Sequence, residues 1–222
     1  MQREKGSAHE ADKTKNADRP NKPDKQNPDK AEKPDKRKAL IEAARARFRE
    51  FGISKTSMQE IAEDAGMAVG TVYLYFKNKD DLILGCAERF AENHRVSAAK
   101  ILASKMAADQ KLRRYILDRY RAVEETRTGS KFAVEIARRV IKLRPERFEE
   151  DDQWLYENIL TILREGEAAG LFRSSDFAAD ARIFVQSVLY FLPVAGLEPY
   201  RPPTEKRLIE VIDWFVEKWK GG

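Results

Sequence analysis

The sequence predicts an all-α fold of about nine helices, divided into a small N-terminal three-helix domain and a larger helical bundle. From Leu40 onward, apolar residues recur at the three- and four-residue spacing that is typical of helices. No segment shows the alternation of a half-buried strand bounded by hairpin turns. Proline and glycine divide the C-terminal part into pieces of helix length, at Pro145, Gly170, Pro193 and Pro202-Pro203.

The composition excludes several classes of protein. The chain has 222 residues, of which 42% are hydrophobic and 36% charged, which suits a soluble protein with its own core. The best apolar run, 188–197, contains Pro193 and is too short to span a membrane. The first residues lack the apolar stretch of a secretory signal. The single cysteine, Cys86, excludes a disulfide or a CxxC metal site within one chain. We therefore expect a cytoplasmic protein that has no membrane part.

Residues 1–35 form a tail rich in Lys, Pro and Asp that we expect to be disordered. No Val, Ile, Leu, Phe, Tyr or Trp occurs before Leu40, so the tail has no large apolar side chain to bury. Residues 1–38 hold most of the net charge of +5, with 12 Lys or Arg against 8 Asp or Glu. Two interpretations stay open, a basic arm that adds nonspecific attraction to nucleic acid and a solvated spacer with interleaved acids.

The helices follow from local patterns. The first is predicted to end at Gly52, a residue type that commonly follows a helix, and its apolar face consists of Leu40, Ile41, Ala44, Phe48 and Phe51. The others are expected near 57–65, 69–76, 79–95, 98–108, 110–127, 131–143, 151–169, 176–192 and 204–219. We assign 36–95 to the first domain and 96–222 to the second.

The segment 56–75 has the pattern of two short helices joined by a tight turn. Ser57 with Glu60, or Thr56 with Gln59, can form a capping box at the start of the first helix. Gly66 suits the reversal, because glycine adopts a left-handed backbone at little cost. This arrangement is a helix-turn-helix motif, whose second helix enters the major groove of DNA.

The second helix of the motif has side chains that suit contact with DNA. Gly70 lets the backbone approach closely, and Thr71 can donate to a phosphate or touch a thymine methyl. Tyr73 and Tyr75 carry hydroxyl donors, and Lys79 at the next helix start can clamp a phosphate. We expect the remaining apolar residues to face the core: Val72, Leu74 and Phe76.

The stretch from Phe51 to Leu82 resembles the DNA-binding domain of the TetR family of transcriptional regulators. It carries the pattern F-G-x-x-x-T-[TS]-x-x-x-I-A-x-x-A-G-x-x-x-G-T-x-Y-x-Y-F-x-x-K-x-x-L. Ala68 departs from it, since many members have Ser or Thr there, and the lost cap costs about 1 kcal/mol. The resemblance covers about 36–95 and implies DNA contacts by five residues: Ser57, Thr71, Tyr73, Tyr75 and Lys79. Gly70 and Val69 complete the predicted contacts, Val69 at a position that the family often uses for base contact, although it has no hydrogen-bonding group.

The second domain has a weaker resemblance to the same family. Residues 163–172 are similar to a helix end, G-x-x-x-G-x-[FL], that is common in such regulators. Their C-terminal domains are helical bundles that dimerise and usually hold a small effector, which the resemblance implies here. The apolar helices near 176–192 and 204–219 then form a homodimer interface as a four-helix bundle. Ordinary intramolecular core is the alternative.

We expect the effector to be largely apolar and to lie among the middle helices. Ligand pockets are mostly apolar with a few placed polar groups. Each aromatic candidate can instead belong to the core, and each amide can instead cap or reach solvent. The candidates are Tyr115, Tyr120, Phe132, Trp154, Asn158, Phe184 and Gln186.

Catalysis finds no support in the sequence, and we predict no cofactor and no metal site. The histidines are His9 in the tail and His94 on a charged helix, and neither joins a nucleophile and an acid in a recognisable pattern. The acidic run 149–152 is interpreted as the start of a helix, where carboxylates favour the helix dipole.

We therefore expect a repressor that binds a palindromic double-stranded DNA operator as a homodimer and is released by an effector. One alternative is a ligand-independent activator or architectural DNA-binding protein. Another is a helical enzyme or adaptor that retains the motif.

Overall fold

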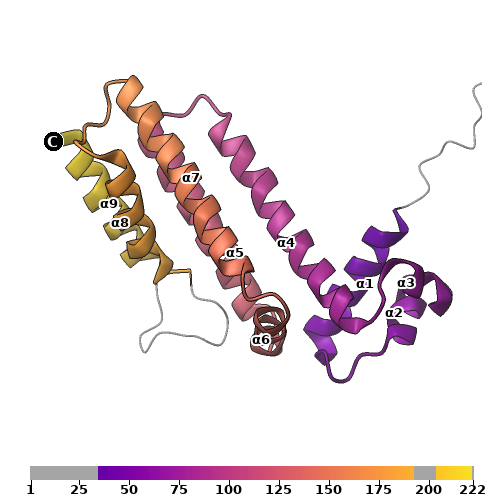
Figure 1. Ribbon diagram of the computed structural model, residues 1–222. Helices are drawn as coiled ribbons and strands as arrows, with labels where there is room; N and C mark the ends of the chain where they lie inside the picture. Colours follow the sequence, from indigo (N-terminus) through magenta and orange to yellow (C-terminus); the bar gives the residue numbers. More distant parts are fainter. Residues whose placement is uncertain (1–34, 193–203, 222) are drawn as a thin grey trace, which may run out of the picture. The chain divides into compact units, whose positions relative to one another are not determined.

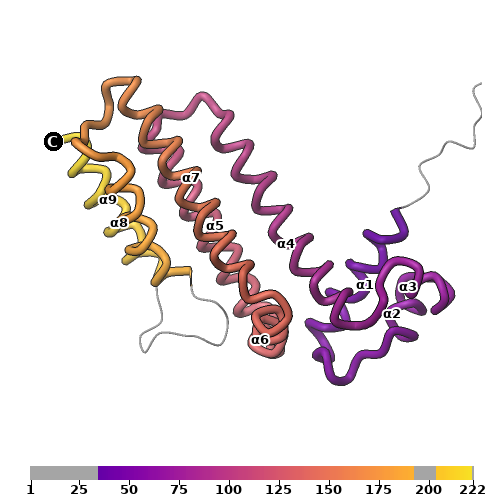
Figure 2. The backbone as a smooth tube through the Cα atoms, in the orientation of Figure 1, coloured from indigo at the N-terminus to yellow at the C-terminus, as the bar shows by residue number. Residues whose placement is uncertain are grey.

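The computed structural model describes residues 35–192 and 204–221, and within these ranges the chain forms nine α-helices and no strand. Figures 1 and 2 show α1, α2 and α3 gathered around the first part of α4, and α5, α7, α8 and α9 together in a bundle. The all-α prediction is confirmed. The helices are α1 Lys36–Phe51, α2 Met58–Asp64, α3 Val69–Tyr75, α4 Lys79–Leu102, α5 Ala108–Thr128, α6 Ala133–Leu143, α7 Arg147–Ala168, α8 Phe177–Leu189 and α9 Glu205–Gly221. The tail predicted to be disordered, 1–35, lies outside the described residues except for Asp35, which caps α1. The breaks at Pro193 and Pro202-Pro203 also lie outside them.

Helix α4 differs from the prediction. Two helices were expected, at 79–95 and 98–108, but α4 is one helix of 24 residues. Neither Gly nor Pro interrupts 95–98, so the backbone has no reason to leave the helix there. It ends where the amide and hydroxyl of Ser104 both donate to the carbonyl of Ile101. The predicted domain boundary at 95–96 therefore falls inside a continuous helix.

The first three helices and the start of α4 share one buried core. Phe48 of α1, Ile61 of α2 and Val72 of α3 are each at most 1% exposed, and Leu82 of α4 closes the cluster. Phe51 was expected on the same face but is half exposed, and its ring lies 5.7 Å from the guanidinium carbon of Arg47.

The bundle has a separate core in which aromatic rings meet from several helices. Phe184 of α8 lies 5.1 Å from Phe215 and 5.7 Å from Trp219 of α9, between ring centroids. Phe172 lies 5.8 Å from Trp219. The buried carboxylate of Asp180 ties α8 to α9, because it accepts hydrogen bonds from the indole of Trp219 and the ammonium of Lys218.

Helix α6 attaches the bundle to the first domain. Val140 of α6 belongs to the core of the first three helices. Glu135 accepts hydrogen bonds from the amide and hydroxyl of Ser54, at 3.3 and 2.9 Å. Arg139 forms a two-bond ion pair with Asp80 in the first turn of α4. Helix α6 therefore contacts both the loop after α1 and the start of α4.

Across the described helices, none combines the length and apolar character that crossing a membrane requires.

Candidate nucleic-acid interface and an adjoining cavity

The start of α2 is fixed by a capping box and by an arginine from α1. The Ser57 hydroxyl accepts from the amide of Glu60, and the Glu60 carboxylate accepts from the amide of Ser57 at 2.7 Å. The hydrogen bond from the Ser57 backbone holds the pKa of Glu60 below its usual range. Arg47 reaches Glu60 and Asp64, one turn apart on α2. The Ser57 capping box is confirmed, whereas the Arg47 clamp was missed because its partners lie far along the sequence.

The turn between α2 and α3 has the predicted backbone. Gly66 has a φ of 65°, and the next amide, that of Met67, donates to Ala62 at 2.8 Å. Ala68 precedes α3 and provides no side-chain cap, as expected from its departure from the family pattern. Helix α3 therefore depends on its packing, which comes mainly from Val72.

Helix α3 turns an apolar face to solvent. Leu74 was predicted to face the core, but it is 82% exposed. A residue two positions after Val72 lies about 200° around a helix, so both cannot be buried on one side. Phe76 reaches the core because the chain has already left the helix there, with an extended backbone. The other large exposed side chains of α3 are Val69, Tyr73 and Tyr75.

The remaining DNA-contact candidates lie as follows. Gly70 is exposed, and a Cβ added there would meet no atom within 4 Å. Thr71 is half-buried, and its amide donates to the carbonyl of Ala68. Ser57 is exposed but its hydroxyl serves the capping box. These positions lie within the two helices of the motif or at their starts.

Lys79 has a structural role that the sequence did not indicate. Its ammonium donates to the carbonyl of Ile53 at 2.9 Å and to that of Thr56 at 2.8 Å. These carbonyls belong to the loop between α1 and α2. An ammonium carries three protons, so one remains for a further acceptor.

A cavity of about 1330 Å³ opens beside this domain. Its walls come from α1, α4, α5, α6 and α7 and from the end of α8. Apolar lining includes Phe90, Ile101 and Phe148.

Two of the seven predicted ligand residues line this cavity. Tyr115 and Trp154 do so, with ring centroids 6.2 Å apart in an edge-on arrangement. Asn158 does not line the cavity, but its amide donates to the phenol oxygen of Tyr115 at 3.1 Å. The other four do not line this cavity. Tyr120 and Phe184 are buried in the bundle core, Gln186 is exposed on α8, and Phe132 faces Gly52. An apolar helix face does not by itself distinguish a core from a cavity.

The cavity also has charged lining that the sequence analysis missed. Within residues 35–192 and 204–221, Arg119 makes no ion pair and its buried Nε has no hydrogen-bond acceptor. No hydrogen bond or ion pair joins Asp151 or Asp152 to another described side chain. Burial raises the pKa of Asp152, and the negative charge of Asp151 adds to this against the opposing effect of Arg119. A ligand that both donates and accepts hydrogen bonds would satisfy these groups. In the described part of the chain, no group of His, Cys, Asp and Glu side chains is placed to hold a metal ion.

A capped helix, a glycine turn and a short second helix with an exposed face define a helix-turn-helix DNA-binding domain, joined here to a helical bundle. Residues 40–86 match the sequence model of the family described as "Bacterial regulatory proteins, tetR family". Residues 40–86 therefore form a DNA-binding domain of this family.

Proteins that are similar over most of the chain have the same fold. An uncharacterised helix-turn-helix transcriptional regulator of Bacillus subtilis, YhgD, is 24% identical over 187 residues, which are 82% of this chain and 95% of that protein. A transcriptional regulator of Cytophaga hutchinsonii has a similar fold, with a TM-score of 0.69 at 23% identity over 82% of this chain and 97% of its own. SmeT, the repressor of a Stenotrophomonas maltophilia efflux pump, was solved with triclosan; that complex has a TM-score of 0.61 at 20% identity over 83% of this chain and 91% of its own.

Proposed function

We propose that the chain is a homodimeric repressor that binds a palindromic operator and leaves it when a small molecule occupies the cavity. One observation carries the proposal. Helix α4 contributes Leu82 and Ile83 to the core of the DNA-binding domain and Phe90, His94 and further residues to the wall of the cavity. A ligand that displaces α4 therefore displaces the DNA-binding domain. The protein would act in the cytoplasm, and no catalytic step or cofactor enters the proposal.

The operator is tested by selecting bound duplexes from a random DNA library. A two-fold dimer presents two recognition helices to successive major grooves, so the proposal expects inverted half-sites with centres roughly 34–36 Å apart. Direct repeats or single half-sites would contradict the dimeric arrangement. Absence of any selected duplex at low salt would favour the helical enzyme or adaptor.

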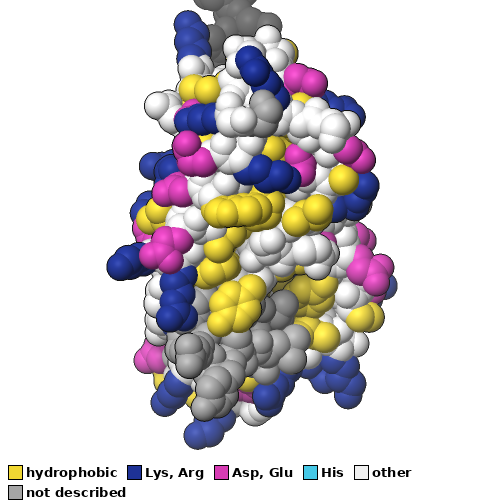
Figure 3. Space-filling model, turned by 90° about the vertical axis from the view of Figure 1, so that its left-hand side faces the viewer, with side chains coloured by type: hydrophobic (Ala, Val, Ile, Leu, Met, Phe, Trp, Pro, Cys, Tyr) yellow, Lys and Arg dark blue, Asp and Glu magenta, His cyan; other side chains and the backbone are white. Residues whose placement is uncertain are grey.

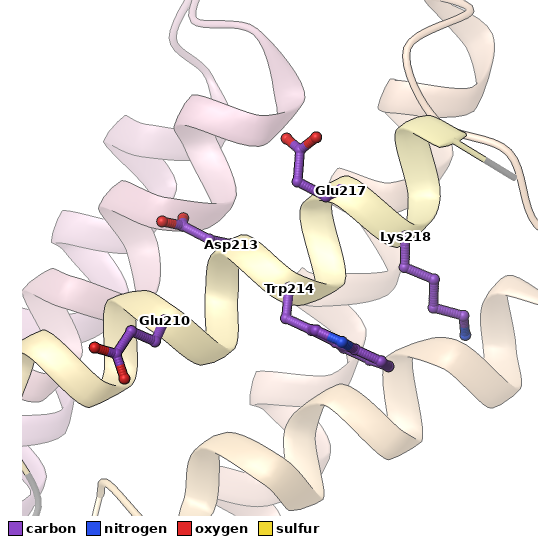
Figure 4. A pocket seen from close by; sticks show the side chains of 5 residues that line it. All are labelled: Glu210, Asp213, Trp214, Glu217 and Lys218. Atoms are coloured by element: carbon purple, nitrogen blue, oxygen red, sulfur yellow. The ribbon is translucent and has the colours of Figure 1, made fainter.

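The proposed dimer interface is the face of α8 and α9. Figure 3 shows hydrophobic side chains gathered in the middle of this face, with charged side chains at its margins. Ile183 of α8 is 55% exposed and Trp214 of α9 is 63% exposed. In Figure 4, Trp214 and Lys218 project from one side of α9 while Glu217 projects from the opposite side. Large exposed apolar side chains on two adjacent helices are typical of an interaction face.

Substitution of Ile183 tests this interface. Ile183→Glu should give monomers in size-exclusion chromatography with light scattering, because a dimer would bury two unpaired carboxylates. Val96→Glu is a matched control, since Val96 is 50% exposed on α4, and this variant should stay dimeric. A dimeric Ile183→Glu protein with native helix content would place the interface elsewhere.

Release from DNA tests the cavity. Triclosan and lauroyl-CoA are suitable first probes within a broader metabolite panel, because solved relatives hold them. A bound probe should change the fluorescence of Trp154, which lines the cavity, and should lower the anisotropy of a labelled selected duplex. Ala122→Trp would fill the cavity from α5 and should keep DNA binding while losing the response. DNA binding that no cavity ligand changes would favour the ligand-independent regulator.

A further inference from the structure

The exposed face of α3, the recognition helix of the motif, is apolar, and contacts inside the protein do not account for this. Leu74 belongs to neither buried core. Gly70 lies four residues before it, and residues at this spacing share one face of a helix. A side chain at position 70 would meet no protein atom within 4 Å, and glycine destabilises a helix relative to alanine. Both residues are therefore free to contact a partner outside the chain.

The chemistry of DNA restricts what such residues can recognise. In the major groove every base pair presents hydrogen-bonding atoms, and the single apolar group is the C5-methyl of thymine. Helix α3 carries no charged side chain and no amide side chain. Val69 and Leu74 can therefore distinguish bases through the thymine methyl, and Gly70 lets the backbone approach the base edges.

We infer that Leu74, with Gly70 on the same face, and Val69, about 140° away around α3, contact thymine methyls, so that methyl contacts set the operator sequence in each half-site. This inference rests on the proposed DNA-binding function. The hydroxyl groups of Tyr73 and Tyr75 can contact the DNA backbone, which positions the helix without reading the sequence. Thr71 can add either a phosphate or a methyl contact.

The test replaces thymine by deoxyuridine, one position at a time, in the duplex selected from the random library. This change removes only the methyl and leaves the hydrogen-bonding edge intact. Burial of one methyl corresponds to roughly fourfold in affinity. We expect at least one thymine in each half-site whose replacement weakens binding about fourfold, and a combined loss of about 16-fold when both half-sites are changed.

Variants of Leu74 and Gly70 then show which residue contacts the methyl. Leu74→Ala should weaken binding to the thymine duplex, and it should no longer respond to deoxyuridine at the position that Leu74 contacts. Its stability should match the wild type, because Leu74 is almost fully exposed. Val96→Ala removes an exposed apolar side chain from α4 and should respond to deoxyuridine as the wild type does. Gly70→Ala should weaken binding to the selected duplex without lowering the melting temperature.

The outcomes separate the inference from the function on which it rests. Failure to select any duplex would overturn the DNA-binding function and the inference together. A selected duplex whose affinity changes less than twofold at every deoxyuridine position would overturn the inference alone. Equal deoxyuridine losses in the wild type and in Leu74→Ala and Gly70→Ala would also overturn it, since the methyl would then be read by other residues.

Discussion

Replacing Lys79 by methionine should lower stability, although Lys79 lies in the DNA-contact set. The substitution keeps the apolar stem and removes the ammonium that donates to the carbonyls of Ile53 and Thr56. Hydrogen bonds to charged groups contribute about 1.5–3 kcal/mol each. Lys79 is only partly buried, so water replaces some of this, and we expect a total loss of about 2–3 kcal/mol. For a chain of this size that lowers the melting temperature by about 4–12 °C.

The matched control is Lys77→Met, two residues earlier. Lys77 is exposed, and no described residue accepts a hydrogen bond from its ammonium, so its replacement should change stability by less than about 0.5 kcal/mol. Thermal unfolding followed by circular dichroism measures both variants. A Lys79→Met protein that melts within about 2 °C of the wild type would refute the structural role, because the two loop carbonyls would not then need the ammonium.

The salt dependence of DNA binding separates this structural role from a phosphate contact. The logarithm of affinity falls with the logarithm of salt concentration by about 0.9 per phosphate neutralised. If the third proton of Lys79 contacts a phosphate, Lys79→Met should reduce the slope by about 0.9 per protomer. If the ammonium serves only the loop, affinity should fall while the slope stays the same. Tyr73→Phe provides the comparison, since it removes a neutral donor and should weaken binding with an unchanged slope.

Three further predictions concern buried groups. Burial raises the pKa of Cys86 to about 12, so native protein should resist alkylation at pH 8. Because the folded state favours the neutral thiol, the free energy of unfolding should fall as pH rises from about 9 toward 12. Urea unfolding should show a smaller fall for Cys86→Ala. Burial opposes ionisation of Asp180, but hydrogen bonds from Ser174, Lys218 and Trp219 outweigh it and lower the pKa of this carboxyl. Its contribution to the free energy of unfolding should therefore be present above about pH 4 and lost as pH falls further. Asp180→Asn should cost about 1–3 kcal/mol at pH 7 and flatten the acid unfolding curve, and equal curves would contradict this account. A Cβ at Gly166 would overlap the ring of Phe172, so Gly166→Ala should cost about 1–3 kcal/mol in urea unfolding, whereas an unchanged midpoint would mean that the ring moves freely.

Local patterns predicted the helix-turn-helix motif well, because its determinants lie within one or two turns of each other. The Ser57 capping box and the left-handed Gly66 each depend on neighbouring residues. The uncapped start of α3 follows in the same way from Ala68. The error at Leu74 arose from reading alternate apolar residues as one face, although a helix rotates by about 100° per residue.

Longer-range partnerships were not predictable from one sequence. The contacts of Arg47 with Asp64 and of Lys79 with Ile53 join residues 17 and 26 positions apart, and no periodicity marks them. The lining of the cavity was not predictable for a related reason. Aromatic residues predicted its neighbourhood, but whether a ring fills a core, as Phe184 does, or lines a hollow, as Trp154 does, depends on how the helices pack.

The proposed coupling between the cavity and the DNA-binding domain has a natural energy scale in this fold. Regulatory coupling typically amounts to about 1–3 kcal/mol, which changes affinity roughly 5–150-fold. The attachments of α6 to the first domain, from Glu135 to Ser54 and from Arg139 to Asp80, are half exposed, and such pairs contribute up to about 1 kcal/mol each. To favour the arrangement in which these two attachments are broken, a ligand needs to bind that arrangement more tightly by no more than the free energy that the attachments contribute. Because coupling is reciprocal, operator DNA must weaken the ligand by the same factor as the ligand weakens DNA. Arg139→Gln should therefore reduce both factors equally.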